Sequence, residues 1–229
     1  MSANLTFSGA DVYEHFEDFN LKANATLPLP WVEKDVSSAG TPANDFTGNY
    51  PGEWQTTHAA TNENEITGLF WNDAVSLDPT KGLVFEARVK LTAAGGVMAS
   101  TERMVVGLAS AHNDDLDAIT NCVWFRVGDA ADLAVKVESD DGTTNTDDQA
   151  GQKGNGSAVS VTSGSYHTYR IELDDLSRIK FVFDGELIGT TSASELSSGM
   201  QPYIMLEKDS GTDQHAMTVD YCHIKVDRD

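Results

Sequence analysis

The chain has 229 residues, of which 40% are hydrophobic, so it can bury a substantial core in one large domain or two small ones. Aspartate and glutamate outnumber lysine and arginine by 36 to 15, giving a formal net charge of −21. A field of this sign repels phosphate groups, which argues against nucleic acid or an anionic membrane as a partner. The excess of acidic residues is then interpreted as a solvated surface, as calcium binding or as docking on a basic partner.

Short segments with strand patterns follow one another along the whole chain, with turn residues between them and almost no helical periodicity. In the first half, the predicted strands are 13–19, 31–36, 53–59, 65–71, 83–91, 103–110, 122–127 and 133–138. In the second half, they are 158–162, 166–173, 179–184, 186–189, 203–207 and 217–226. Residues 195–198 are expected to form one helical turn at most.

The alternation of apolar and polar residues is cleanest over 83–91. Its odd positions are all apolar and its even positions 86, 88 and 90 are charged, as in a strand with one face in the core. Two other segments, 104–108 and 123–127, are almost continuously apolar. Such runs predict central strands that are covered on both faces.

A hairpin is expected around Asp184 and Gly185, which separate two alternating segments. An Asp-Gly pair favours a type I′ turn, because that turn needs positive φ at both central residues. The regular spacing of strands and turns predicts a double-layer antiparallel sandwich.

The domain organisation follows from two loop-like stretches. Residues 37–52 contain two prolines and form the best candidate boundary, but the segment before them is too short for its own core. We therefore expect residues 1–30 to form an N-terminal arm or leading strand and residues 31–229 to form a single sandwich domain. Residues 140–156 are expected to form a long solvated loop. The two cysteines, Cys122 and Cys222, are buried thiols in one interpretation and a disulfide in the other.

Glycoside hydrolysis is the first chemistry to test, because it requires two carboxylates around the sugar bond. Glu138 and Asp140 fit the first two positions of a Glu-x-Asp-x-x-Glu strand pattern, but Thr143 occupies the third. The incomplete pattern indicates a protein without catalytic residues.

Asn113, Asp115 and Asp117 have the alternate spacing with which a loop can wrap around Ca²⁺. Ala118 and Trp124 stand where an EF-hand requires glycine and glutamate, so these three residues are only weak calcium candidates. No cofactor is expected.

A sugar could stack on an exposed tryptophan with polar neighbours, and Trp71, followed by Asn72 and Asp73, is the one with such neighbours. These three residues are the carbohydrate-binding candidates. The alternative is that all four tryptophans pack in the sandwich.

Residues 83–229 resemble a concanavalin A-like jelly roll of the laminin-G type, through FEARVKL, WFRV, SYHTYRIELDD, IKFVFDGELIGT and VDYCHIKV. The upstream blocks FEDF, WVEKDVSSAGTPA and EWQTTHAATNENEITGLFWND are similar to structural proteins of tailed bacteriophages. The resemblance implies an all-β concanavalin A-like jelly-roll sandwich of two antiparallel sheets.

The resemblance also implies a non-enzymatic virion protein that decorates the capsid exterior. Its implied partners are the major capsid protein and copies of itself, in a homo-oligomer such as a trimer, with residues 1–30 as the contact segment. The alternative function is a lectin-like module that binds a glycan, for example in host attachment.

Overall fold

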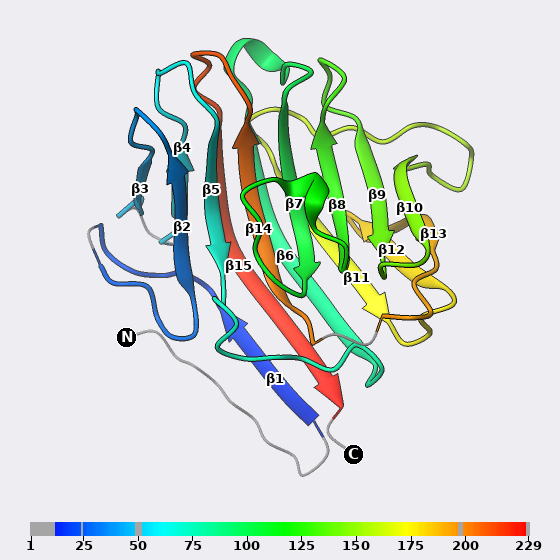
Figure 1. The fold of residues 1–229 in the computed structure, drawn as a ribbon. Helices are drawn as coiled ribbons and strands as arrows, with labels where there is room; N and C mark the ends of the chain where they lie inside the picture. The colour runs from blue at the N-terminus through cyan, green and yellow to red at the C-terminus, as the bar shows by residue number, and fades with distance from the viewer. Residues whose placement is uncertain (1–11, 24, 49–51, 197–198, 228–229) are drawn as a thin grey trace.

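The computed structural model describes residues 12–23, 25–48, 52–196 and 199–227, which form two antiparallel sheets packed face to face (Figure 1). The eight-stranded sheet has the order β13-β12-β11-β6-β15-β4-β3, and β1 pairs with β15 beside this path. Its strands are β1 (Val12–Glu17), β3 (Ala43–Phe46), β4 (Trp54–Thr57), β6 (Leu83–Thr92), β11 (Tyr166–Leu173), β12 (Ile179–Phe183), β13 (Glu186–Thr191) and β15 (Ala216–Asp227).

The seven-stranded sheet has the order β10-β9-β8-β7-β14-β5-β2. Its strands are β2 (Val32–Ser37), β5 (Glu65–Phe70), β7 (Glu102–Ala109), β8 (Cys122–Gly128), β9 (Val135–Asp140), β10 (Asn145–Ala150) and β14 (Gln201–Lys208). The described helical segments are two short 3₁₀ turns, η1 (Ala94–Gly96) and η2 (Leu116–Ala118). Within the described ranges, no helix has the length and apolar character that crossing a membrane requires.

Two strands lie where the sequence predicts loops. β3 falls inside the expected boundary region 37–52, and β10 falls inside the expected solvated loop 140–156. Both are polar edge strands, ANDF and NTDDQA, that join their sheets through backbone hydrogen bonds and so need no apolar alternation. Residues 158–162, expected as a strand, contribute only isolated bridges from Ala158 and Ser160.

The core lies between the two sheets, and β6 contributes every second side chain to it, as the alternation predicts. The segments predicted to be covered on both faces, in β7 and β8, are indeed buried throughout. The outer faces of β7, β8 and neighbouring strands support a second apolar cluster, which contains Trp124 of β8, Tyr203 of β14, and Leu116 and Ile119 of the loop that carries η2. In Figure 1 this green loop lies in front of the seven-stranded sheet.

The predicted hairpin joins β12 to β13, with Phe183 paired to Glu186. Asp184 and Gly185 have φ angles of 48° and 79°, the positive values that the Asp-Gly signal predicts. Cys122 and Cys222 are buried free thiols, which agrees with the first of the two interpretations of the cysteines.

Residues 12–17 of the expected arm or leading strand form β1, which pairs along its full length with β15. After β1, Phe19 is fully buried and its ring centroid lies 5.3 Å from that of Trp31. Residues 1–11 lie outside the described residues, and the division at residue 30 stays a prediction.

Candidate functional site

The outer face of the seven-stranded sheet carries buried charged residues beside the second apolar cluster. Strand alternation places Arg103 of β7 opposite Glu207 of β14, and the Arg103 guanidinium donates to the Glu207 carboxylate. Burial raises the pKa of Glu207 to about 7, although Arg103 opposes that shift. The two strands therefore hold a buried ion pair on this face, next to the first residue of β7 and the last residue of β14.

A second arginine lies one strand further along the same face. The Arg126 Nη1 atom of β8 is 2.7 Å from Asp117 Oδ1 and 3.3 Å from Glu138 Oε2, and Nε donates to Asp129. The Trp124 indole N–H also donates to Glu138 Oε2, at 2.5 Å. Burial raises the pKa of Glu138 to about 7, because it outweighs the charge of Arg126 and the hydrogen bond from Trp124.

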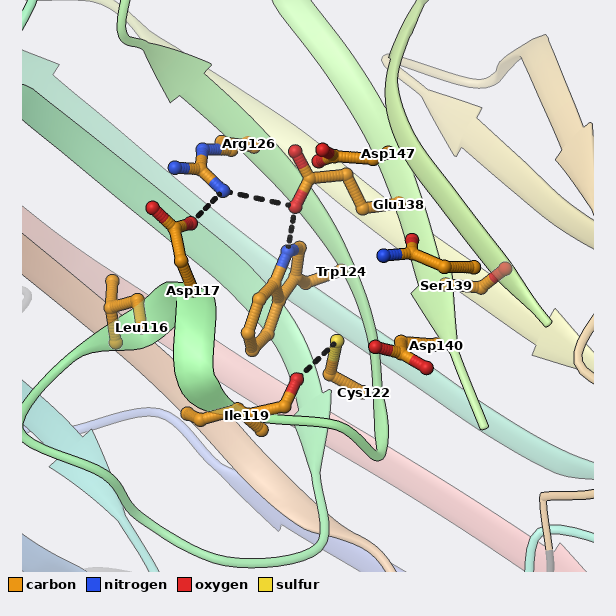
Figure 2. Close-up of a pocket in the computed structure, with 11 residues that line it drawn as sticks. Leu116, Asp117, Ile119, Cys122, Trp124, Arg126, Glu138, Ser139, Asp140 and Asp147 are labelled. Carbon is orange, nitrogen blue, oxygen red and sulfur yellow. Dashed lines mark hydrogen bonds and ion pairs between the residues drawn. The ribbon is translucent and has the colours of Figure 1, made fainter. Parts of the chain in front are cut away.

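These side chains surround a small pocket of about 80 Å³ (Figure 2). Trp124, Arg126 and Glu138 come from β8 and β9, and the η2 loop supplies an apolar wall. Residues from β9 and β10 add polar groups. The whole lining is Leu116, Asp117, Ile119, Cys122, Trp124, Arg126, Glu138, Ser139, Asp140, Asn145 and Asp147. We call this the outer-face pocket.

Two groups of described side chains have the proximity that a metal ion requires. One group, at the outer-face pocket, consists of Glu138, Asp147 and Asp148. The other consists of Glu102, Asp213 and His215, where a hydrogen bond of 2.5 Å already joins His215 Nε2 to Glu102. Only the first group lies at the outer-face pocket.

The carbohydrate candidates Trp71, Asn72 and Asp73 do not form a stacking platform. Trp71 has no exposed surface, and its ring packs edge-to-face on Trp31 with centroids 5.8 Å apart. The Gln201 side-chain oxygen accepts from the backbone N–H groups of Trp71 and Asp73. These contacts hold a turn after β5, and sugar binding by the three residues stays a prediction.

The calcium candidates Asn113, Asp115 and Asp117 lie in the loop before β8. Asn113 Oδ1 accepts the N–H of Asp115, and Asp115 Oδ1 accepts the N–H of Asp117. Asp117 forms ion pairs with Arg103 and Arg126. Their side chains are therefore used for turn formation and for arginine pairing, and they are not among the groups with metal-ligand proximity in the described residues.

The sequence indicated part of this site. Glu138 and Asp140, and also the calcium candidate Asp117, line the outer-face pocket, whereas Thr143 donates its N–H to Asp141. Trp124 and Arg126 were not predicted as site residues. The residue pattern of β8 could have indicated them, because their side chains alternate with core residues of that strand.

No protein-family model matches the chain, and no curated protein matches it. Among solved structures, a protein of unknown function from Shewanella oneidensis MR-1 aligns with a TM-score of 0.66 and 12% identity, over 98% of this chain and 90% of that one. The Emp47p carbohydrate recognition domain aligns with a TM-score of 0.59 and 11% identity, over 95% and 98%. The laminarinase catalytic domain from Thermotoga maritima MSB8 aligns with a TM-score of 0.58 and 9% identity, over 93% and 97%.

Identities this low establish the fold alone. These structures give no link to a bacteriophage or a virion, so capsid decoration stays a prediction. With two antiparallel sheets arranged as in these structures, the chain has the concanavalin A-like jelly-roll fold that its sequence predicts.

Proposed function

We propose that the protein is a carbohydrate-binding module whose ligand sits at the outer-face pocket. The observation that carries the proposal is the pocket itself, a polar depression on the outer face of a sheet, bounded by a long loop. The fold of the chain is also that of the Emp47p carbohydrate recognition domain and of the laminarinase catalytic domain.

The pocket suits part of a sugar and not a whole ring. Its volume of about 80 Å³ is well below the range of roughly 300–1,000 Å³ that is typical of pockets enclosing an entire small molecule. Asn145 and Asp147 are exposed at the pocket, and Asp140 is half-buried. These groups can form hydrogen bonds with the hydroxyl groups of a sugar that enters the pocket edge-on. The rest of the oligosaccharide would then lie on the surface of the sheet.

A glycan array tests the proposal. We expect the wild type to bind a defined subset of glycans and the double variant Glu138→Gln, Asp147→Asn to lose that binding. The matched control is Glu172→Gln on β11 of the other sheet, which should bind like the wild type. No binding on the array, or equal binding by all three proteins, would contradict the proposal.

Glycoside hydrolysis is the second candidate, because Glu138 faces the Asp147 and Asp148 carboxylates with oxygen atoms within 4.8 Å of one another. Closely spaced carboxylates are what such hydrolysis needs. A screen with oligosaccharides would have to reveal hydrolysis that Glu138→Gln abolishes and Glu172→Gln leaves unchanged.

A carbohydrate-binding module is compatible with the expected place on a capsid exterior, where it could contact host glycans. On a capsid, the partners would be the major capsid protein and further copies of the chain, assembled as a trimer. Co-purification with intact capsids and the native mass of the assembly test this role separately from glycan binding.

A further inference from the structure

A β-bulge in the edge strand β10 brings two consecutive aspartates beside Glu138. β10 pairs with β9, and the register shifts between Thr146 and Gln149, so Asp147 and Asp148 together lie opposite the single residue Glu138. A bulge changes the direction of side chains along a strand. Asp148 has a φ of 51°, in the left-handed region that few residues other than glycine adopt. Both carboxylates consequently lie near the same glutamate.

The spacing of the three carboxylates matches one bound ion. One oxygen atom each from Glu138, Asp147 and Asp148 lies within 4.8 Å of the others. Calcium–oxygen bonds are about 2.3–2.6 Å long, so two oxygens on the same ion are at most about 5 Å apart. A single calcium ion can therefore reach all three.

An independent observation comes from the second oxygen of Glu138. Glu138 is 5% exposed, and its Oε1 atom accepts no hydrogen bond; among the described residues only a proton shared with Asp148 gives it a partner. Its Oε2 atom already accepts from Trp124 and Arg126. In Figure 2 the free oxygen lies on the side of Asp147. A buried acceptor without a partner is costly, and a cation at this position would satisfy it.

We propose that Glu138, Asp147 and Asp148 form a binding site for one divalent cation of the calcium type. Carboxylate oxygens are ligands that calcium prefers, and its flexible geometry tolerates three side chains with water in the remaining positions. The transition metals that favour nitrogen and sulfur fit less well, since these three side chains offer neither.

Two cations of the protein compete for these carboxylates. Lys136 Nζ lies 3.0 Å from Asp148 Oδ1, and Arg126 contacts Glu138 Oε2. Arg126 also has Asp117 and Asp129 as partners, whereas Lys136 pairs with a carboxylate of the site itself. Removing the charge of Lys136 should therefore strengthen binding of the ion.

The ion site does not depend on sugar binding. Its test contains no glycan, so the failure of one proposal is distinguishable from the failure of the other.

Titration calorimetry with CaCl₂ measures the affinity directly. We expect one saturable site in the wild type, a loss of affinity of at least about tenfold in Asp147→Asn, Asp148→Asn, and a gain in Lys136→Gln. Both aspartates are exposed on an edge strand, so this double variant should fold. The matched control is Asp213→Asn, in the other acidic group, which should bind within about twofold of the wild type.

Terbium luminescence places the ion. Tb³⁺ replaces Ca²⁺ at oxygen sites and emits when a nearby tryptophan is excited, and Trp124 contacts Glu138 directly. The wild type should show emission that Ca²⁺ suppresses, and the variant Asp147→Asn, Asp148→Asn should lose that emission. The proposal is overturned if the wild type binds no calcium, if the aspartate double variant binds as well as the wild type, or if Asp213→Asn alone loses binding.

Discussion

At the scale of single residues, the described chain buries several ionisable groups whose protonation is linked to folding. His58 is the clearest of them, with 1% exposure. Its Nε2 atom lies 3.3 Å from the carbonyl oxygen of Leu206, and its Nδ1 atom has no hydrogen-bond partner. Burial lowers the pKa of His58 to about 3, and the neighbouring Lys208 and His215 act in the same direction.

The histidine therefore makes folding sensitive to acid. Because its pKa is lower in the folded chain than in the unfolded chain, the unfolded state binds more protons below about pH 6.5. This contribution to stability is complete above that pH and is lost as the pH falls toward 3, by at most about 1.4 kcal/mol per pH unit. His15, whose pKa burial lowers to about 4, contributes with the same sign.

Urea denaturation between about pH 7 and pH 4.5 checks this in the wild type and in His58→Gln, which can still donate to Leu206. We expect the free energy of unfolding to fall more steeply with acid in the wild type than in the variant. Parallel pH curves would show that His58 does not have a lowered pKa.

At the scale of elements, the sequence predicted strands with an alternating or a continuously apolar pattern and missed the polar edge strands β3 and β10. β6 and β11 place alternate side chains in the core. Because those positions must be apolar, the sequence of each strand shows a period of two residues. β3 and β10 bury little at the sheet edges, and their polar residues leave no such pattern.

The site could be predicted only in part. Glu138 was singled out because it fits, with Asp140, the first two positions of a Glu-x-Asp-x-x-Glu strand pattern. Asp147 and Asp148 looked like part of a solvated loop, because a bulge is defined by its pairing with another strand. The cover over Trp124 could not be predicted either, since the η2 loop reaches the outer face only through tertiary contacts.

The leading strand β1 provides a prediction at this scale. Phe19 is fully buried against Trp31, whereas Phe16 is 39% exposed and stacks on Tyr221. We expect Phe19→Ala to lower the free energy of unfolding by about 3–5 kcal/mol, because it leaves a cavity. Phe16→Ala should cost roughly 1 kcal/mol. Chemical denaturation compares the two, and equal small losses would mean that this segment is not part of the folded unit.

At the scale of the whole molecule, the net charge of −21 sets the response to salt. Repulsion among exposed carboxylates is screened as the Debye length falls from about 30 Å at 0.01 M salt to about 8 Å at 0.15 M. The buried pair of Lys208 and Glu65 is screened much less. We expect the midpoint of thermal unfolding to rise with NaCl in the presence of a chelator. A falling midpoint would show that attractive surface pairs outweigh the repulsion.

The fold places a loop-bounded, polar pocket on the outer face of the seven-stranded sheet, where we propose that glycans bind. Chemical-shift mapping of backbone amides during titration with a panel of oligosaccharides tests whether they do. We expect saturable shifts concentrated in residues 116–126 and 138–149, with the outer face of the eight-stranded sheet unaffected. Shifts confined to other surfaces, or none with any oligosaccharide of the panel, would contradict it.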